Sequence, residues 1–233
     1  MRTLLVANAD DADPGYIGQR FVDHGFIGER FRQHGGKFEH CERENTATWP
    51  TLDGADLVIL LGSWWSAYWP NIQKNVRAEC DLIVETHRRG IPLFGICYGA
   101  QIMATALGGS AQRAQHHEVG WHEVFAAAPN EVIGGTWLQW HYDSFTPPES
   151  CEILATSPAG PQAIRAGRCF ATQFHPEVTE QIVQRWASES GADELARIGL
   201  NASELIAQTK REVTRSAPAA AKLVDWFMET TAR

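Results

Sequence analysis

The sequence lacks a surplus of positive charge and any long apolar run. Among its 233 residues, 20 Lys and Arg stand against 28 Asp and Glu, so the formal net charge is −8. A balance of this sign argues against a protein that grips a phosphate backbone, and we expect no nucleic-acid partner. No stretch approaches the ~20 apolar residues that cross a bilayer, and the N-terminus lacks the apolar length and cleavage site of a signal peptide. We therefore expect a cytoplasmic protein without a membrane partner.

The sequence also lacks paired cysteines and a phosphate-binding loop. Its five Cys residues are scattered and never form a C-x-x-C pair, which is typical of free thiols in a reducing compartment and not of a disulfide framework or a zinc cage. No G-x-x-x-x-G-K-[ST] segment is present. Hydrophobic residues make up 44% of the chain, enough for a buried core. Because no linker or compositional shift divides the sequence, we expect one domain over residues 1–233.

Strand and helix patterns alternate in the first part of the sequence. Apolar residues at three- and four-residue spacing predict helices at Ile17–His34 and Asn71–Arg89. This rhythm is typical of an α/β fold with an open, mostly parallel sheet and helices on both of its faces. The short apolar runs that predict the strands are Thr3–Ala9, Lys37–Arg43, Asp56–Leu61 and Pro92–Ile96.

From residue 110 to residue 175 the pattern changes to closely spaced short strands divided by Gly, Pro and Ser. They predict hairpins or an antiparallel extension of the same sheet. From about residue 179 the pattern is helical again, and we expect Pro218 in the first turn of the last helix. The predicted strands are Val119–Phe125, Trp137–Tyr142, Glu152–Thr156, Gln162–Arg165 and Cys169–Phe174, and the predicted helices are Glu180–Glu189, Glu194–Val213 and Ala219–Thr230.

The segment Ile91–Gly109 combines an apolar strand, a glycine-flanked cysteine and a helical pattern. Gly95 and Gly99 stand two residues before and two residues after Cys97. This spacing allows a cramped strand-to-helix turn that lifts a side chain above a sheet. A thiol at that point lies at a helix N-terminus, whose dipole favours the thiolate. Taken alone, the pattern fits a nucleophile and a buried structural cysteine equally well.

A second segment ends a predicted strand in His175-Pro176-Glu177. Pro176 favours extended geometry at His175, and residues two apart in an extended chain project to the same side. Glu177 can therefore reach the imidazole and fix its tautomer, while the other ring nitrogen faces a nucleophile. Because Cys97 is expected at another strand end of the same sheet, the two segments together predict a nucleophile, a base and an orienting carboxylate.

Three segments, GICYGAQ, QWHYDSF (Gln139–Phe145) and QFHPEVT, resemble those of the class I, triad-type glutamine amidotransferases. The resemblance is to stand-alone members similar to the amidotransferase half of GMP synthetase. It covers residues 3 to about 179 and implies a flavodoxin-like architecture. It also implies that Cys97 attacks the carboxamide of glutamine, that His175 is the general base and acid, and that Glu177 orients His175. Ammonia then leaves, and water hydrolyses the glutamyl thioester.

The same resemblance implies an oxyanion hole. The backbone amide of Tyr98 would pair with an amide from the turn after the third strand, where Gly62 and Ser63 are the match. The family has a double glycine followed by proline at this turn, whereas this sequence reads Gly62-Ser63-Trp64. An oxyanion-hole donor matters because the loss of one typically costs ~10²–10³ in rate.

The resemblance further implies a pocket for the small-molecule substrate, glutamine or a γ-glutamyl compound. Gln101, on the first turn of its helix, matches a glutamine that contacts the substrate. Tyr142 and Asp143 match a loop whose backbone groups hold the amino-acid end of glutamine. The inferred chemistry needs no cofactor and no metal.

Several other groups of residues have a structural interpretation. The acidic run at Asp10, Asp11 and Asp13 is typical of a solvated loop, although carboxylates also suit hard cations. A surface or hairpin face is favoured over a zinc site for the His- and Glu-rich run because neighbours on a strand face opposite ways. The tryptophans near the motifs fit core packing, a pocket wall or a docking patch. The His- and Glu-rich run consists of His116, His117, Glu118, His122 and Glu123. The tryptophans near the motifs are Trp64, Trp65, Trp69, Trp137 and Trp140.

Three functions remain open at this stage. The first is cysteine-dependent hydrolysis of the glutamine amide, which releases ammonia for a separate synthetase subunit or acts as a free-standing amidase. The second is γ-glutamyl peptide hydrolysis, which uses the same triad on a different leaving group. The third is a regulatory domain with a degenerate site, against which the intact Cys97, His175 and Glu177 argue.

Overall fold

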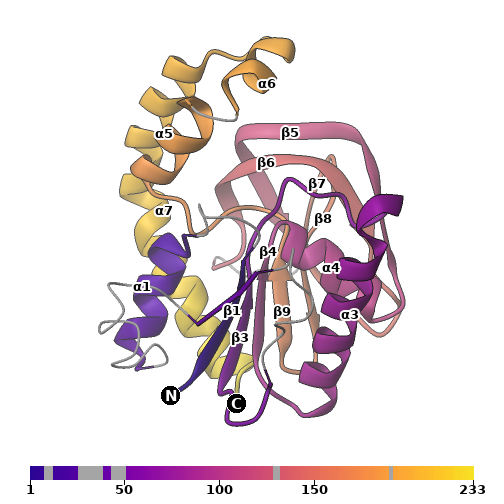
Figure 1. The fold of residues 1–233 in the computed structure, drawn as a ribbon. Helices are drawn as coiled ribbons and strands as arrows, with labels where there is room; N and C mark the ends of the chain where they lie inside the picture. The colour runs from indigo at the N-terminus through magenta and orange to yellow at the C-terminus, as the bar shows by residue number, and fades with distance from the viewer. Residues whose placement is uncertain (8–12, 26–38, 43–50, 128–131, 189–190) are drawn as a thin grey trace.

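The computed structural model describes residues 1–7, 13–25, 39–42, 51–127, 132–188 and 191–233. These residues form one nine-stranded sheet with the order β2-β1-β3-β4-β9-β8-β7-β5-β6 (Figure 1). The first five strands in this order run parallel, and the other four extend them antiparallel. The bounds are β1 Thr3–Ala7, β2 Glu39–Glu42, β3 Leu57–Leu60, β4 Leu93–Ile96, β5 Ser110–Ala126, β6 Gly135–Thr146, β7 Glu152–Ser157, β8 Gly160–Ala166 and β9 Cys169–Thr172.

Helices cover both faces of the parallel half of the sheet (Figure 1). On one face, α1 and the C-terminal part of α7 pack against β1, β3, β4 and β9, with Phe21, Phe94 and Phe227 in mutual edge contact. On the other face, α3 and α4 bury their apolar residues against the same strands. The predicted α/β fold, an open sheet covered by helices, is therefore confirmed. The helix bounds are α1 Gly15–Asp23, η2 (a 3₁₀ turn) Pro70–Ile72, α3 Gln73–Arg88, α4 Tyr98–Ala106 and α7 Ala202–Thr230.

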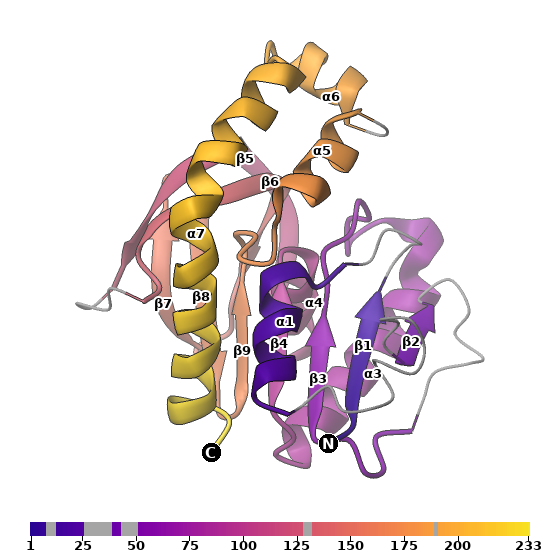
Figure 2. The same cartoon turned by 90° about the vertical axis from the view of Figure 1, so that its left-hand side faces the viewer.

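Two short helices, α5 (Glu180–Ser188) and α6 (Ala192–Arg197), pack with the N-terminal part of α7 against the β5–β6 hairpin. Figure 2 shows them beyond the tips of the parallel strands β1 and β3. We call α5 and α6 together the α5–α6 cap. Trp121 of β5 donates a hydrogen bond to Thr209 of α7 at 3.0 Å, which ties the hairpin to the long helix.

The predicted helix start near Pro218 is wrong. Pro218 lies inside α7, which runs without interruption from Ala202 to Thr230. Proline removes one helical hydrogen bond, and in a helix interior it is less favourable than alanine by about 3 kcal/mol of helix stability. The helix continues because both of its halves are anchored by burial, with Leu205 and Thr209 on one side of Pro218 and Leu223 on the other.

The bounds of other helices and strands also differ from the predicted ones. The segment Glu194–Val213 is two helices, because Gly199 adopts a φ of +75° and the Asn201 side chain then caps α7 by accepting from two backbone amides. The strand predicted at Val119–Phe125 begins earlier, at Ser110, with an irregular register between Arg113 and Glu118. Helix α1 ends at Asp23, and part of the helix predicted up to His34 lies outside the described residues. No described helix has the length and apolar character needed to span a bilayer.

The topology brings the candidate residues together at one edge of the sheet. Cys97 follows β4, Gly62 comes shortly after β3, and His175 comes shortly after β9. These three strands are parallel neighbours, and ligands of open α/β sheets bind outside the carboxyl ends of such strands. The sheet therefore positions the site.

Candidate active site

Cys97 occupies a strained turn between β4 and α4. Its φ of +54° and ψ of −106° make it the only residue other than glycine with a positive φ in the described chain. Such a conformation costs on the order of 1–3 kcal/mol and persists only where its surroundings enforce it. The two glycines predicted to allow this turn are spatially required. A Cβ on Gly95 would lie 2.9 Å from the Cβ of Ala171, and one on Gly99 would lie 2.6 Å from the carbonyl oxygen of Leu60.

The Cys97 side chain is buried but borders a cavity. Its backbone amide donates to the carbonyl of Thr172 in β9 at 2.7 Å, which fixes the turn to the neighbouring strand. The side-chain amide of Gln173 lies 3.5 Å from the sulfur and donates to it. Gln101 in turn donates to the Oε1 of Gln173 at 3.3 Å. The sulfur thus has a polar partner on one side and the cavity on the other.

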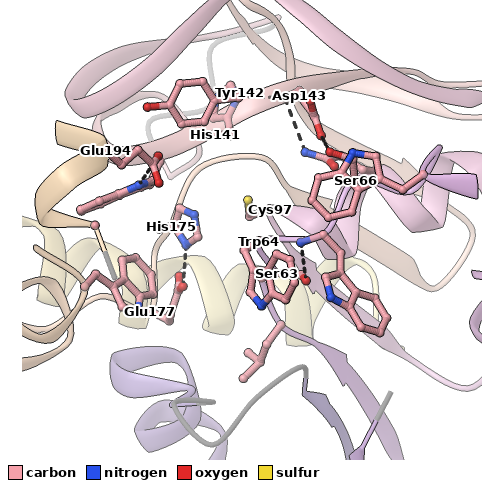
Figure 3. A pocket seen from close by; sticks show the side chains of 18 of the residues that line it. Ser63, Trp64, Ser66, Cys97, His141, Tyr142, Asp143, His175, Glu177 and Glu194 are labelled. Carbon is pink, nitrogen blue, oxygen red and sulfur yellow. Dashed lines mark hydrogen bonds and ion pairs between the residues drawn. The ribbon is translucent and has the colours of Figure 1, made fainter. Parts of the chain in front are cut away.

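His175 and Glu177 form the predicted pair. Nδ1 of His175 lies 2.7 Å from Oε1 of Glu177, and both residues are less than 5% exposed. In Figure 3 the imidazole lies between the Glu177 carboxylate and Cys97. The backbone amide of His175 donates to Leu138 of β6 at 2.9 Å, and the amide of Tyr16 in α1 donates to the carbonyl of Glu177 at 3.0 Å. Elements far apart in sequence therefore hold the pair in place.

The charge state of His175 follows from this arrangement. Burial lowers the pKa of its imidazolium, but the charges of Glu177 and Cys97 outweigh burial and raise the pKa to about 10. The imidazole Nε2 is buried and has no hydrogen-bond partner among the described residues. His175 is thus held as a proton donor or acceptor next to the sulfur.

Gly62 lies against both of these side chains. A Cβ placed on it would stand 3.3 Å from Cε1 of His175 and 3.6 Å from Cβ of Cys97. Ser63 stabilises the turn that follows, because its Oγ accepts the backbone amide of Trp65 at 2.9 Å. Tyr98, the other residue matched to the oxyanion hole, is the first residue of α4, where the helical amides point out of the helix end.

The residues matched to the amino-acid end of the substrate lie on a strand and not on a loop. Tyr142 and Asp143 belong to β6, because the β5–β6 hairpin is longer than predicted. The buried Asp143 carboxylate accepts a hydrogen bond from Ser66 and another from Tyr68 at 2.9 Å. Its backbone carbonyl is 3.5 Å from the side-chain amide of Gln101. Gln101 and Asp143 therefore occupy the same side of the cavity.

Next to Asp143, a buried polar network supports the strand. His141 Nδ1 lies 2.9 Å from the Asp143 carbonyl, and its Nε2 lies 3.3 Å from the Glu118 carboxylate. Ser157 and Gln162 also donate to Glu118. Burial raises the pKa of Glu118, but the hydrogen bonds from His141 and Ser157 outweigh burial and hold it below its ordinary value. The predicted exposed hairpin face is thus wrong for Glu118, whereas His116, His117 and Glu123 are exposed.

The cap forms the wall next to His175. The Trp186 ring of α5 meets the His175 ring edge to face, with centroids 5.1 Å apart, and lies 5.9 Å from the Trp140 ring. Trp140 donates its indole N–H to Glu194 of α6 at 3.1 Å. On the opposite wall, Trp64 is 70% exposed and contacts the rings of Trp65 and Trp69. Of the tryptophans near the motifs, two belong to the core: Trp137 is 2% exposed and stacks on Phe174, and Trp65 is 8% exposed.

The proposed triad and most of the polar and aromatic side chains around it border one cavity of about 270 Å³, close to the lower end of the volumes typical of small-molecule sites. No group of three or more His, Cys, Asp or Glu side chains in the described part of the chain is arranged to hold a metal ion. Asp13 instead lies 3.3 Å from Arg185, and Asp10 and Asp11 lie outside the described residues. The lining includes Gly62, Ser63, Trp64, Cys97, Gln101, Arg113, Trp140, Tyr142, Asp143, His175, Glu177, Trp186 and Glu194.

The sequence matches the model of a known protein family. Residues 37–185 match the model described as glutamine amidotransferase class-I. The chain belongs to the class-I glutamine amidotransferase family. The resemblance noted from the three sequence segments is therefore confirmed.

Individual relatives agree with this assignment. The glutamine-hydrolyzing GMP synthase of Aeropyrum pernix is 36% identical over 138 residues, which are 53% of this chain and 27% of that protein. The same enzyme from Bordetella avium is 33% identical over 143 residues, 54% of this chain and 26% of that protein. The match thus spans about a quarter of the length of these relatives.

Solved structures match over nearly the whole chain. A glutamine amidotransferase from Thermotoga maritima has a TM-score of 0.81 and 27% identity, with 99% of both chains covered. Another, from Methylobacillus flagellatus, has a TM-score of 0.78 with 98% of this chain and 94% of that chain covered. Its identity of 16% makes it evidence for the fold alone.

Some residues of this amidotransferase site were not identified from the sequence. Gln173 stands two residues before His175, and the rule that placed Glu177 beside His175 could have suggested it. Ser66 and Arg113 reach the cavity only because β6 pairs with β5 and approaches the turn after β3. Trp186 and Glu194 reach it through the α5–α6 cap, for which no local motif exists.

Proposed function

We propose that this amidotransferase hydrolyses the side-chain amide of glutamine through a thioester on Cys97. The observation that carries the proposal is the meeting of Cys97 and the His175–Glu177 pair against Gly62, at the wall of the cavity. Family membership and the glutamine-hydrolyzing activity named for the GMP synthase relatives support glutamine as the substrate.

In the first half of the reaction, the Cys97 sulfur attacks the amide carbon and its proton resides on Nε2 of His175. The carbonyl oxygen becomes an oxyanion, which the backbone amides of Gly62 and Tyr98 stabilise. The carbon–nitrogen bond then breaks, and His175 gives its proton to the leaving nitrogen. Ammonia departs and a glutamyl thioester remains. The raised pKa of His175 supports this role, because the ring carries the proton at neutral pH.

In the second half, water attacks the thioester carbon while His175 takes a proton from the water. The carbon–sulfur bond breaks, its electron pair stays on the sulfur, glutamate leaves, and His175 again carries the proton. Glu177 keeps the Nδ1 side of the ring occupied throughout, so that Nε2 does the proton transfer. Gln101 and Asp143 hold the amino-acid end of glutamine on the opposite side of the cavity.

We also propose that the ammonia serves a synthetase partner, because the matching relatives are glutamine-hydrolyzing GMP synthases. Alternatively, the protein is a free-standing amidase that uses the same chemistry and releases the ammonia.

We also propose that residues 1–233 form a single domain, because the described strands all belong to one sheet. Thermal unfolding should then show a single cooperative transition.

Glutamate release from glutamine tests the catalytic proposal. The wild-type chain should turn over glutamine, and Cys97→Ser should abolish turnover while the thermal midpoint changes little, since oxygen replaces sulfur at a buried but cavity-lining site. Cys80→Ser is the matched control and should keep the activity. Retained activity in Cys97→Ser would show that another group is the nucleophile.

A further inference from the structure

The side of the cavity that receives the leaving group can be located, given the proposed function. The leaving nitrogen must stand beside Nε2 of His175, because that atom protonates it. The His175 ring is in edge contact with Trp186 of the α5–α6 cap, whereas Gln101 and Asp143 lie together at the other end. Figure 3 shows Glu194 on the His175 side of Cys97 and Asp143 on the opposite side. The leaving group therefore faces the cap.

The cavity contains four carboxylates, and three of them have a cationic partner. Glu177 pairs with His175 at 2.7 Å, Asp13 with Arg185 at 3.3 Å, and Asp143 with Arg113 at 3.7 Å. Glu194 differs, because none of the Lys, Arg or His side chains described in the structure lies within ion-pair distance of it. The leaving-group side of the cavity thus carries an unbalanced negative charge.

The unbalanced carboxylate is held within an aromatic wall. Trp140 donates to Glu194 at 3.1 Å, and a Cβ on Gly191 would lie only 2.6 Å from the Trp140 ring, so this ring has little room to move. Burial first, and then the nearby charge of Glu194, raise the pKa of Tyr142 to about 12, so the phenol remains neutral. Glu194 therefore contacts Trp140, lies near Tyr142 and lines the cavity together with Trp186.

A carboxylate among aromatic faces is the combination that binds an alkylammonium group, since the carboxylate pairs with the charge and the ring faces attract it. We propose that the leaving-group side of the cavity binds a protonated amine, so that γ-glutamyl amides of diamines are substrates and their distal ammonium group contacts Glu194. The bonds involved are those of the proposed reaction. The amide carbon–nitrogen bond breaks, and the departing diamine takes the proton of His175 while the glutamyl group remains on Cys97 as the thioester that water then hydrolyses.

The test compares kcat/KM for γ-glutamyl amides of diaminobutane, pentylamine and aminobutyric acid. Their leaving amines are similar in length and end in a cation, a methyl group and an anion, respectively. The wild-type chain should prefer the cationic amide over the neutral one by about tenfold, the effect of one charged contact. In Glu194→Gln the ratio of these two rates should fall to about one.

Two further variants separate binding from folding. Asp193→Asn removes an exposed neighbouring carboxylate of α6 that does not line the cavity, and it should keep the wild-type ratio. Glu194→Lys should invert the preference toward the amide of aminobutyric acid. Equal wild-type rates on the cationic and neutral amides, unaffected by Glu194→Gln, would overturn this inference and leave the proposed function intact. Absence of Cys97-dependent turnover of every amide, glutamine included, would contradict both.

Discussion

Oε1 of Glu177 lies 2.7 Å from Nδ1 of His175 at a site where both side chains are almost completely buried. Burial alone would lower the pKa of the imidazole and favour its neutral form. The carboxylate reverses that effect and, together with Cys97, keeps the pKa of His175 far above its ordinary 6.5. Orientation and protonation of the proposed base therefore depend on the same contact.

Replacing Glu177 by Gln should lower the rate of glutamine hydrolysis, but less than His175→Ala does. The amide can still accept a hydrogen bond from the ring, whereas loss of the general base typically costs about 10²–10⁴. The pKa of His175 should fall in the variant because the negative charge is gone. An NMR titration of the imidazole, together with kcat on glutamine, measures both effects. Equal losses in the two variants would show that Glu177 does more than orient His175.

The same contact predicts how stability depends on pH. The pKa of His175 is raised from 6.5 in the unfolded chain to about 10 in the folded one. The stabilisation is thus fully present below pH 6.5 and is lost as the pH rises toward 10. Thermal midpoints of the wild type should fall across this window, and His175→Gln should show a flatter profile. A wild-type midpoint that rises across the window would contradict the charge state assigned to His175.

Two glycine substitutions should separate folding from catalysis. Gly99→Ala places a Cβ 2.6 Å from the Leu60 carbonyl, a clash with rigid backbone, so it should lower the free energy of unfolding by about 1–3 kcal/mol.

In Gly62→Ala, the added Cβ would lie 3.3 Å from Cε1 of His175, and the imidazole ring must shift by a few tenths of an ångström. It should keep the thermal midpoint and lose about tenfold in kcat, because proton transfer depends on geometry. The converse pattern would refute the placement of Gly62 beside His175.

The network around Glu118 should contribute acid-sensitive stability. The pKa of Glu118 lies below its ordinary 4.5 in the folded chain, so its stabilisation is present above about pH 4.5 and is lost as the pH falls through the folded value. Glu118→Gln should lower the free energy of unfolding by about 2 kcal/mol at neutral pH, because His141 loses its ionised partner. The gap between variant and wild type should narrow on acidification, as measured by denaturant unfolding. Glu123→Gln, at an exposed site of the same strand, is the control.

The core of the site was predictable because its chemistry is encoded in short segments. Gly95, Cys97 and Gly99 define a strained turn by spacing alone, and His175 and Glu177 lie on one side of an extended segment. Placing these segments at adjacent strand ends required only the parallel arrangement that the strand–helix rhythm indicates. The fold class followed from the same rhythm.

The remaining site residues and the bounds of α7 depend on contacts between segments far apart in sequence. Glu194 lines the cavity because α6 packs over β6. Glu118 is buried among polar side chains of three other strands, namely His141, Ser157 and Gln162. Pro218 looked like a helix start because local propensity disfavours proline in a helix interior. Burial on both sides of it outweighs that preference, and such burial cannot be read from a local window.

Covalent labelling of the chain by an electrophilic analogue of glutamine tests the central claim most directly. Burial raises the pKa of the Cys80 and Cys169 thiols to about 12, with nearby charges adding to the effect, so they serve as internal negative controls. Intact-mass and peptide mass spectrometry should show one adduct per chain, located on Cys97, competed by glutamine and absent in Cys97→Ala. An unlabelled Cys97, or an adduct on another cysteine that persists in Cys97→Ala, would contradict the account.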